Sequence, residues 1–483
     1  MREMAQALAT NAYSVLTLDY PGFGDSSGEP GSLAAMIAVA AAGAQLLRSQ
    51  GCSDVALGGI RWGAALALHC ADSVGASAVV AFAPVTSAKR YVRELRLLGL
   101  PDPNGSGGMS VGGYYLSGAL LEEIARLPLA MPATCPVLVI EHGEEDRWGG
   151  QDSEGAQVNT WSAARLGEFL DRTAEDAVVD RPLFDRAAEW LSSQAPRAPQ
   201  SAPAFGVPRI ASSALVSSDG ARCRESFVYL GRDQHPGVMS EPVDSDAAGI
   251  LVLLNSGSDP HSGPGRAWVE VSRFLAASHG WAVVRVDARG WGQAADGPSG
   301  PGRPYDPHFE VDIAQMVGTL REMGWARIVL SGLCSGAWMA LEVARRGGVD
   351  GAIALNPQMY WQYGDVVEAL MADVVARRAD ETADIRAKAA RGVWDREDAA
   401  GERCPAARWL DDLAAQEIPV ELMFVTDDPG HQYLQERLAA RVAAVTSRGD
   451  VQIATLPGVD HAMHQVWLRR EALDAFATAL MRM

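Results

Sequence analysis

The pentapeptide Gly332-Leu-Cys-Ser-Gly336 places a cysteine between two glycines, after an apolar run and before an Ala-containing stretch. Glycines at both ends allow a turn sharp enough to lift the middle side chain above a sheet, as in the strand–turn–helix elbow that presents catalytic nucleophiles. We therefore predict that Cys334 is a nucleophile. Ser335 is off-centre, so we expect its backbone N–H to serve an oxyanion hole. The alternative is a Gly-rich turn around a buried cysteine.

Two further residues follow in the order that such an elbow requires, with the acid after the nucleophile and the histidine last. Asp428 lies in the loop after the apolar run 419–425, and His461 follows the last apolar run of the chain. Asp427 is the alternative acid. His464 is the alternative base, although it is expected about one turn into the last helix. A plain Asp-Asp-Pro-Gly turn is the competing interpretation of the acid.

These residue types suit acyl transfer. An imidazole lowers the effective pKa of a thiol and accepts its proton, while a carboxylate orients the imidazole. The tetrahedral oxyanion needs a second donor from the loop after the third strand, which here is residues 255–264. We expect that donor near Ser256, Gly257 or Ser258. No pattern indicates a cofactor, and the six cysteines lack the paired spacing of a metal site or disulfide framework.

The elements that hold these residues recur in the first half of the chain. Gly59-Ile-Arg-Trp-Gly63 follows an apolar run there, and the apolar segment 15–19 with its Gly-containing turn matches 283–287. Apolar strands alternate with helical stretches such as 64–71 and 337–346, which indicates βαβ units and a mainly parallel sheet flanked by helices in each half. We therefore predict an α/β fold with two tandem α/β-hydrolase domains.

The first of these domains is expected to be degenerate. Its nucleophile position holds Arg61, and a guanidinium stays protonated and cannot act as a nucleophile. No histidine follows its candidate acid, Asp146, within that half, and the sequence starts at a helix, so the first strands are missing. Either this copy borrows sheet edges from elsewhere, or the true start lies upstream. We predict a catalytically inactive domain in which Arg61 binds a carboxylate or phosphate, or forms a buried ion pair.

Composition sets the broad class and the boundaries. A chain of 483 residues with 48% hydrophobic content suggests a soluble protein of two domains, and the net charge of −19 disfavours nucleic acid and anionic membranes as partners. The N-terminus has no export signal, so we expect a cytoplasmic protein. The stretch 192–204, rich in Pro, Ser and Ala, is a predicted linker between residues 1–191 and a catalytic domain over 205–483. The apolar stretch 33–47 is expected to be a buried helix.

A cap is predicted between the elbow and the acid. Residues 358–414 are long enough for helices that cover Cys334. Met359, Tyr360 and Trp361 are expected to line an apolar pocket for an acyl or aryl group, because aromatic and methionine side chains suit such ligands. The alternative is a cap packed on a core of its own.

Together, the two halves resemble the two α/β-hydrolase families that accompany exosortase A gene systems. The N-terminal half is similar to the type with arginine at the elbow, on the segments 59–64, 19–28 and 111–117. The C-terminal half is similar to the cysteine type, on 254–257, 261–264, 332–337, 428–430 and 460–461. The chain departs from both in being a fusion and in lacking the first strands of the N-terminal half. Dienelactone hydrolases, which also have a cysteine elbow, are a more distant likeness.

This resemblance implies acyl-thioester chemistry beside acyl carrier proteins and acyl-activating ligases, without naming a substrate. We therefore expect an acyltransferase that forms an acyl-Cys334 thioester and takes acyl thioesters of a carrier protein or CoA. A thioesterase or esterase that releases free acid is the alternative enzyme. A non-catalytic protein that binds an acyl carrier is the alternative outside enzymes.

Overall fold

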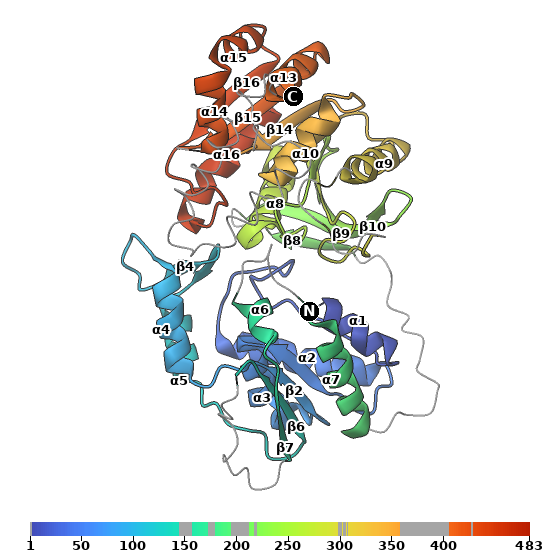
Figure 1. Ribbon diagram of the computed structural model, residues 1–483, viewed down its shortest axis with the longest axis vertical. Coiled ribbons are helices and arrows are strands. Elements are labelled where there is room, and N and C mark those ends of the chain that lie inside the picture. Colours follow the sequence, from blue (N-terminus) through green and yellow to red (C-terminus); the bar gives the residue numbers. More distant parts are fainter. Residues whose placement is uncertain are drawn as a thin grey trace. The chain divides into compact units, whose positions relative to one another are not determined.

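The computed structural model of the chain describes residues 2–143, 157–171, 179–194, 212–216, 220–297, 302, 306, 308–357, 405–426 and 428–483. Two compact units divide the chain, residues 1–207 (unit 1) and 208–483 (unit 2), and both are drawn in Figure 1. The predicted linker begins later than expected, because helix α7 (Arg181–Gln194) includes residues 192–194. There the Ser192 and Ser193 hydroxyls donate to carbonyls of the preceding turn, and Leu191 is buried.

A nine-stranded sheet forms the centre of unit 2 within the described residues. Its spatial order is β16-β15-β14-β13-β11-β12-β10-β9-β8. Neighbours from β16 to β12 pair in parallel, and the pairs of β12 with β10, β10 with β9, and β9 with β8 are antiparallel. The strands are β8 (Ser212–Val216), β9 (Arg222–Leu230), β10 (His235–Pro242), β11 (Ile250–Leu253), β12 (Ala282–Val286), β13 (Ile328–Leu333), β14 (Gly351–Leu355), β15 (Val420–Val425) and β16 (Val451–Leu456).

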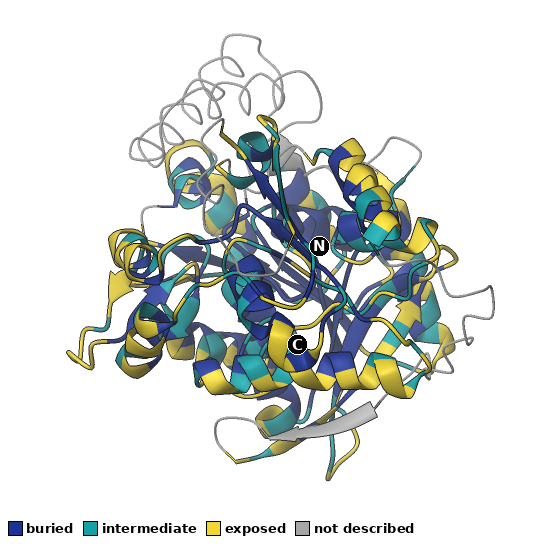
Figure 2. Cartoon of the chain, turned by 90° about the horizontal axis from the view of Figure 1, so that it is seen from below, coloured by how far each residue is buried: buried dark blue, intermediate teal, exposed yellow. Residues whose placement is uncertain are grey.

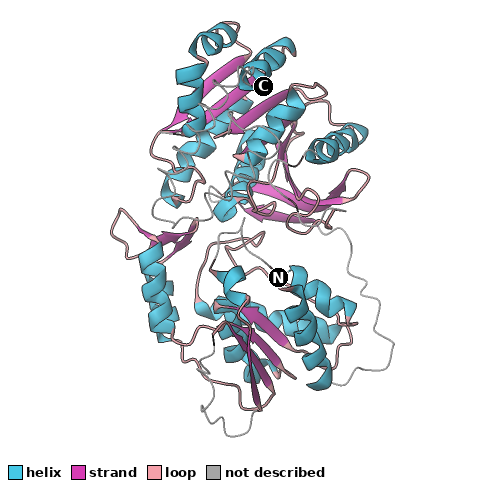
Figure 3. Ribbon diagram, in the orientation of Figure 1, coloured by secondary structure: helices cyan, strands magenta, loops and turns pink. Residues whose placement is uncertain are grey.

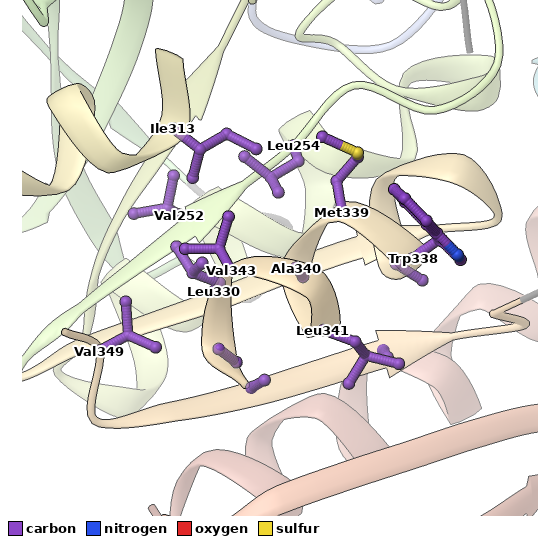
Figure 4. Packing of buried hydrophobic residues seen from close by; sticks show 14 of the residues in the cluster. Val252, Leu254, Ile313, Leu330, Trp338, Met339, Ala340, Leu341, Val343 and Val349 are labelled. Carbon is purple, nitrogen blue, oxygen red and sulfur yellow. The ribbon is translucent and has the colours of Figure 1, made fainter. Parts of the chain in front are cut away.

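Helices cover both faces of this sheet. Successive residues of the parallel strands point to opposite faces, so Leu330 packs into one core cluster and Val329 into the other. Figure 4 shows part of the first cluster, around α10 (Ser335–Ala344). The first cluster also takes residues from α9 (His308–Glu322), α13 (Pro405–Ala415), α14 (Pro429–Arg437) and α15 (Ala439–Thr446). The second takes them from α8 (Ala267–His279) and α16 (Arg469–Leu480), with the short turns η1 (Pro264–Arg266) and η3 (Val466–Leu468) preceding these two helices.

Part of the predicted cap is wrong, because its last residues form helix α13. Its apolar side chains Trp409, Leu410 and Leu413 are buried in the first core cluster. The Trp409 ring lies 5.0 Å from that of Trp338 on α10, between ring centroids. Residues 405–414 therefore belong to the helical layer on the sheet, because their one apolar face is used against α10. Residues 358–404 of the predicted cap lie outside the described residues.

Unit 1 has a smaller parallel sheet of order β1-β2-β6-β7 and a separate antiparallel sheet of order β3-β4-β5, within its described residues (Figure 3). Its strands are β1 (Leu57–Ile60), β2 (Val79–Phe82), β3 (Leu100–Pro101), β4 (Met109–Val111), β5 (Tyr114–Leu116), β6 (Val137–Glu141) and β7 (Val158–Ser162). Its helices, besides α7, are α1 (Arg2–Thr10), α2 (Leu33–Ser49), α3 (Trp62–Val74), α4 (Ala88–Leu98), α5 (Gly118–Arg126) and α6 (Leu166–Leu170).

The predicted strand at residues 15–19 does not form. Val15 and Leu18 are 38% and 40% exposed, and the segment has no strand assignment. Its counterpart in unit 2, β12, is held between β11 and β10. No strand of the described residues pairs with residues 15–19. A strand without a neighbour cannot satisfy its backbone groups in a ladder, so an apolar run alone does not produce one.

Helix α2 is also less buried than the sequence suggested. Only Leu33, Met36, Gly43 and Ala44 are buried, and Leu46 is exposed. An Ala-rich helix has a high helix propensity at every position, so its composition does not show which face packs. No helix in the described parts of the chain is both long and apolar enough to cross a bilayer. Figure 2 shows the general pattern, with buried residues on the strands and exposed residues on the outer turns of the helices.

Candidate active site

Cys334 occupies a sharp turn between β13 and α10. Its φ of 54° and ψ of −113° lie in a region of backbone conformation that residues other than glycine rarely adopt. The flanking glycines are needed for packing: a Cβ on Gly332 would lie 2.3 Å from the Gly336 carbonyl carbon, and one on Gly336 would lie 2.3 Å from the Asn255 carbonyl oxygen. Strand, loop and helix thus approach so closely that no side chain fits at either glycine position.

His461 connects Cys334 with Asp428. Its Nδ1 lies 3.0 Å from Asp428 Oδ2, and its side chain is hydrogen-bonded to Cys334. Asp428 is 2% exposed and caps α14, where its Oδ1 accepts the Gly430 N–H at 2.8 Å. The structure therefore brings together the nucleophile, base and acid that the sequence indicated. The alternative base, His464, instead pairs with Asp460 at 3.0 Å and is 46% exposed, and Asp427 lies outside the described residues.

The contacts of His461 favour its charged form. Burial of the ring works against the charge, but hydrogen bonds to the Asp428 carboxylate and the Cys334 sulfur outweigh it and raise the pKa of His461 to about 10. An imidazole that keeps its proton at neutral pH stabilises a neighbouring thiolate. The His461 imidazole is thus held between the Asp428 carboxylate and the Cys334 sulfur.

Asn356 is a residue of this site that the sequence analysis missed. It is 1% exposed and has a φ of 46° at the end of β14. Its Nδ2 donates to the His461 carbonyl at 2.9 Å, and its Oδ1 accepts the Val425 N–H at 2.8 Å. One amide thus joins the ends of β14 and β15 to the histidine loop. The available signal was an asparagine before a proline at a strand end, since asparagine tolerates positive φ.

The loop after β11 is anchored on a buried carboxylate. Asp287, at the end of β12, accepts hydrogen bonds from Asn255 Nδ2 at 3.0 Å and from the His261 N–H at 2.6 Å, and it contacts the His261 ring at 2.6 Å. Burial works to raise its pKa, but the hydrogen bonds from His261, Gln293 and Asn255 lower the pKa of Asp287 below its usual value. This charged anchor fixes the loop against the sheet edge.

Gly257 is the predicted oxyanion residue that contacts the elbow. Its N–H donates to Ser335 Oγ at 2.9 Å, with a φ of 52° at Gly257. Ser256 is buried, and its carbonyl accepts the Asp259 N–H at 2.8 Å, which closes a turn in the loop. Ser258 is next to Gly257 in the same turn. Among the three candidates, the structure directs the Gly257 N–H at the start of α10.

The predicted pocket residues Met359, Tyr360 and Trp361 lie outside the described residues. A small cavity of about 20 Å³ lies beside the elbow instead, which is space for about one water molecule. Buried residues from the loop after β11, the loop after β12, α9 and α10 form its walls, and these are Leu254, Asn255, Ala288, Trp291, Phe309, Ile313, Ser335 and Met339.

A second group of polar side chains, Asp233, His235 and Asp312, has metal-ligand types in close proximity. Arg289 lies among them, however, and donates to both carboxylates, at 2.8 Å to Asp312 Oδ1. The guanidinium therefore already pairs with both acids, and the group is better explained as an ion-paired junction between α9 and the turn from β9 to β10.

Arg61 repeats the elbow backbone of Cys334 in unit 1. Its φ and ψ are 52° and −116°, and a Cβ on Gly59 would again lie 2.3 Å from the carbonyl carbon of Gly63. The Arg61 side chain is 51% exposed, and its guanidinium lies 3.9 Å from Glu94, which also pairs with Arg90 at 2.9 Å. The alternative of a buried ion pair is therefore wrong, because the guanidinium stands at the surface.

A family model described as the alpha/beta hydrolase family matches residues 251–479. Unit 2 is an α/β-hydrolase domain. No curated protein sequence matches the chain significantly.

Solved structures similar to the hydrolase domain include an esterase from Pyrococcus furiosus, with 16% identity, a TM-score of 0.36, and coverage of 57% of this chain and 91% of the other. An esterase from Pyrobaculum calidifontis has 17% identity, a TM-score of 0.36, and coverage of 58% and 86%. The proline iminopeptidase of Mycobacterium smegmatis has 18% identity, a TM-score of 0.35, and coverage of 53% and 98%. Similarity at this level carries no argument about substrate.

The ionisation of the site predicts unusual reactivity at low pH. An unperturbed cysteine with a pKa near 8.5 is about 0.3% thiolate at pH 6. Cys334 should therefore react with iodoacetamide at pH 6 at least about tenfold faster than Cys52, which lies outside the site and is only partly buried. Asp428→Asn should slow the Cys334 reaction at pH 6 by lowering the pKa of His461, whereas Asp460→Asn should not. Mass spectrometry of each labelled cysteine measures the rates, and equal rates for the two cysteines would exclude an activated thiol.

Asn356→Ala should disturb the position of His461. The lost hydrogen bonds should destabilise the fold by about 1–3 kcal/mol and lower kcat by about tenfold, with little change in KM. Gln416→Ala is the matched control, since the Gln416 amide also donates to a backbone carbonyl, that of Arg345 at 3.0 Å, away from the elbow. Thermal unfolding and steady-state kinetics separate the two effects. An equal loss of kcat in both variants would assign Asn356 to general stability only.

Proposed function

We propose that unit 2 is a cysteine-dependent acyltransferase that works through an acyl-Cys334 thioester. The observation that carries this proposal is the hydrogen-bonded series from Cys334 through His461 to the buried Asp428. Nucleophile, base and orienting carboxylate are then in contact in the order that acyl transfer needs. The match to the hydrolase family supports acyl chemistry in general, and the cysteine supports the transfer variant.

In the proposed reaction, the Cys334 thiolate attacks the carbonyl carbon of an acyl thioester and a tetrahedral oxyanion forms. Backbone N–H groups of Ser335 and Gly257 stabilise that oxyanion. The intermediate then collapses, the bond from carbon to the leaving sulfur breaks, and the leaving thiolate takes the proton of the His461 imidazolium. Neutral His461 next accepts a proton from the acceptor, whose attack on acyl-Cys334 releases the product and restores the thiolate.

The acceptor distinguishes transfer from hydrolysis. A thioester intermediate reacts readily with amines and thiols, which is why we propose transfer. We propose an apolar acyl thioester of a carrier protein or CoA as the donor, on the basis of the sequence resemblance. A thioesterase or esterase that releases free acid is the alternative, and it uses the same residues with water as the acceptor. A non-catalytic acyl-carrier-binding protein is the remaining alternative.

Cys334→Ala should lower turnover of an acyl thioester by about a thousandfold or more while the fold remains intact. Cys334→Ser tests the acceptor, because an oxyester intermediate should retain some hydrolysis and lose transfer to amines. Intact mass spectrometry of the wild type with a panel of acyl thioesters should show an acyl adduct on Cys334. Full turnover by the alanine variant would contradict the assignment, and an intact fold with neither adduct nor turnover would favour a binding protein.

We further propose that unit 1 is non-catalytic and that Arg61 binds a carboxylate or phosphate group. The support is an elbow backbone that presents a half-exposed guanidinium with one distant partner among the described residues. A guanidinium pairs well with such groups. In unit 2 the carbonyl of Asn255 covers Gly336, whereas among the described residues no atom lies within 4 Å of a Cβ placed on the equivalent Gly63.

Arg61→Ala should therefore weaken binding of acetyl-CoA about tenfold, since a charge-assisted hydrogen bond contributes about 1.5–3 kcal/mol. Arg90→Ala is the matched control, because Arg90 pairs with the same Glu94 but does not stand at the elbow. Isothermal titration calorimetry on the full chain measures both affinities. Equal affinities for the wild type and Arg61→Ala would remove this role.

A further inference from the structure

Ser335 can contribute to the site in two ways, through its backbone N–H and through its side-chain hydroxyl. It is the first residue of α10 and directly follows Cys334, so its backbone N–H belongs to the proposed oxyanion hole. Its side chain is equally placed for a role, because Oγ accepts the Gly257 N–H at 2.9 Å and the residue is 5% exposed. One of the two donors that the reaction needs is thus already bonded to a hydroxyl of the protein.

That hydrogen bond has a physical reason. A buried backbone N–H without a partner is costly, and in the free protein the Gly257 N–H has no substrate oxygen to which it can donate. A hydroxyl oxygen accepts in the same way as the oxyanion, although without its charge. Since a charged acceptor forms the stronger hydrogen bond, an arriving oxyanion displaces the hydroxyl favourably.

The cavity beside the elbow gives the displaced hydroxyl a place to go. Ser335 lines that cavity, and its volume of about 20 Å³ suffices for one water-sized group. The other walls are apolar except for the Trp291 indole N–H and Asn255, whose amide is already bonded to Asp287 and to the Asp259 carbonyl. In Figure 4, Met339, Leu254 and Ile313 of these walls lie together on one side of α10, and Leu341 lies on the other.

We propose that the Ser335 hydroxyl is a placeholder for the substrate's oxyanion. It holds the Gly257 N–H in the free protein and rotates into the cavity when the tetrahedral intermediate forms. The Gly257 N–H then passes from Ser335 Oγ to the substrate oxygen, and no covalent bond to Ser335 forms or breaks. This inference rests on the proposed function and makes Ser335 a positioning residue that sets how easily the hole accepts charge.

Ser335→Ala is the first test, because it keeps the backbone N–H of residue 335 and removes the placeholder. The kcat/KM for an acetyl thioester should rise about three- to tenfold. This is the range expected when the hydrogen bond from Gly257 to Ser335 no longer has to be broken before the oxyanion binds. Affinity for an alkyl trifluoromethyl ketone, which forms a hemithioketal oxyanion on a cysteine, should rise by a similar factor. A fall in both quantities, with an unchanged melting temperature, would overturn the placeholder and make the hydroxyl a supporting part of the hole.

Filling the cavity is the second test. Ala288→Val should lower kcat/KM when Ser335 is present and have little effect in the Ser335→Ala background, because there is then no hydroxyl to accommodate. Ala340→Val is the matched control, since Ala340 is buried in the same core cluster and does not line the cavity. Its effect should be equal in both backgrounds. If the effect of Ala288→Val is also equal in both, the cavity does not serve Ser335.

Different results would contradict the cysteine mechanism and the placeholder role of Ser335. Turnover that survives Cys334→Ala removes the cysteine mechanism and the placeholder with it. Turnover and a trifluoromethyl ketone adduct that both require Cys334, combined with lower activity in Ser335→Ala, remove the placeholder alone. Melting temperatures of all variants show whether any loss reflects unfolding instead.

Discussion

The backbone at residue 334 is the constraint on which the site depends. A positive φ at a cysteine carries strain, and the surroundings have to hold it. They do so through close approach: Gly332 lies against the Gly336 carbonyl, and Gly336 lies against the Asn255 carbonyl. Because these contacts leave no room for a Cβ, the strand, the helix and the β11 loop are fixed relative to one another. The thiol then stands above the sheet edge without needing its own contacts to hold it there.

Two polar networks extend this rigidity to the other functional groups. Asn356 joins the end of β15 to the His461 carbonyl, and Asp287 holds the loop that carries Gly257. Each network uses a buried group whose hydrogen bonds are made to loops from different parts of the chain. Buried polar groups in this situation stabilise one arrangement over its alternatives, since any shift leaves donors unpaired. The positions of His461 and of the Gly257 loop thus depend on buried groups outside the proposed triad.

Comparison of the two units shows which features belong to the fold and which to the chemistry. The elbow backbone is nearly identical at Arg61 and Cys334, and the turn after the first matched segment is also shared, since a Cβ on Gly24 or Gly292 would meet the preceding aspartate at 2.2 Å. Within the described residues, no loop lies against Gly63, the second glycine of the unit 1 elbow. The strained turn therefore persists without the nucleophile. A catalytic site requires the loops that bring donors and base to that turn.

The sequence by itself determined the features that depend on residues close together in the chain. Glycines around Cys334 predicted the elbow, and the order of strand, acid and histidine predicted Asp428 and His461, because each of these depends on turns and runs of a few residues. Tertiary structure decided the features that depend on pairing between residues far apart in the sequence. Residues 15–19 have an apolar run and no neighbouring strand, and α13 has an apolar face that packs on α10 instead of covering the elbow.

The same reasoning explains the contacts that the sequence analysis missed. The bond from Asn356 to His461 spans 105 positions in the chain, and the bond from Gly257 to Ser335 spans 78. A single sequence contains the donors and acceptors for such bonds but no sign of which ones meet. Their pairing is set by the order of strands in the sheet, which places β11, β13, β14 and β15 side by side with their carboxyl ends at one edge. Local sequence therefore specified the chemistry available at Cys334, and strand order specified which groups reach it.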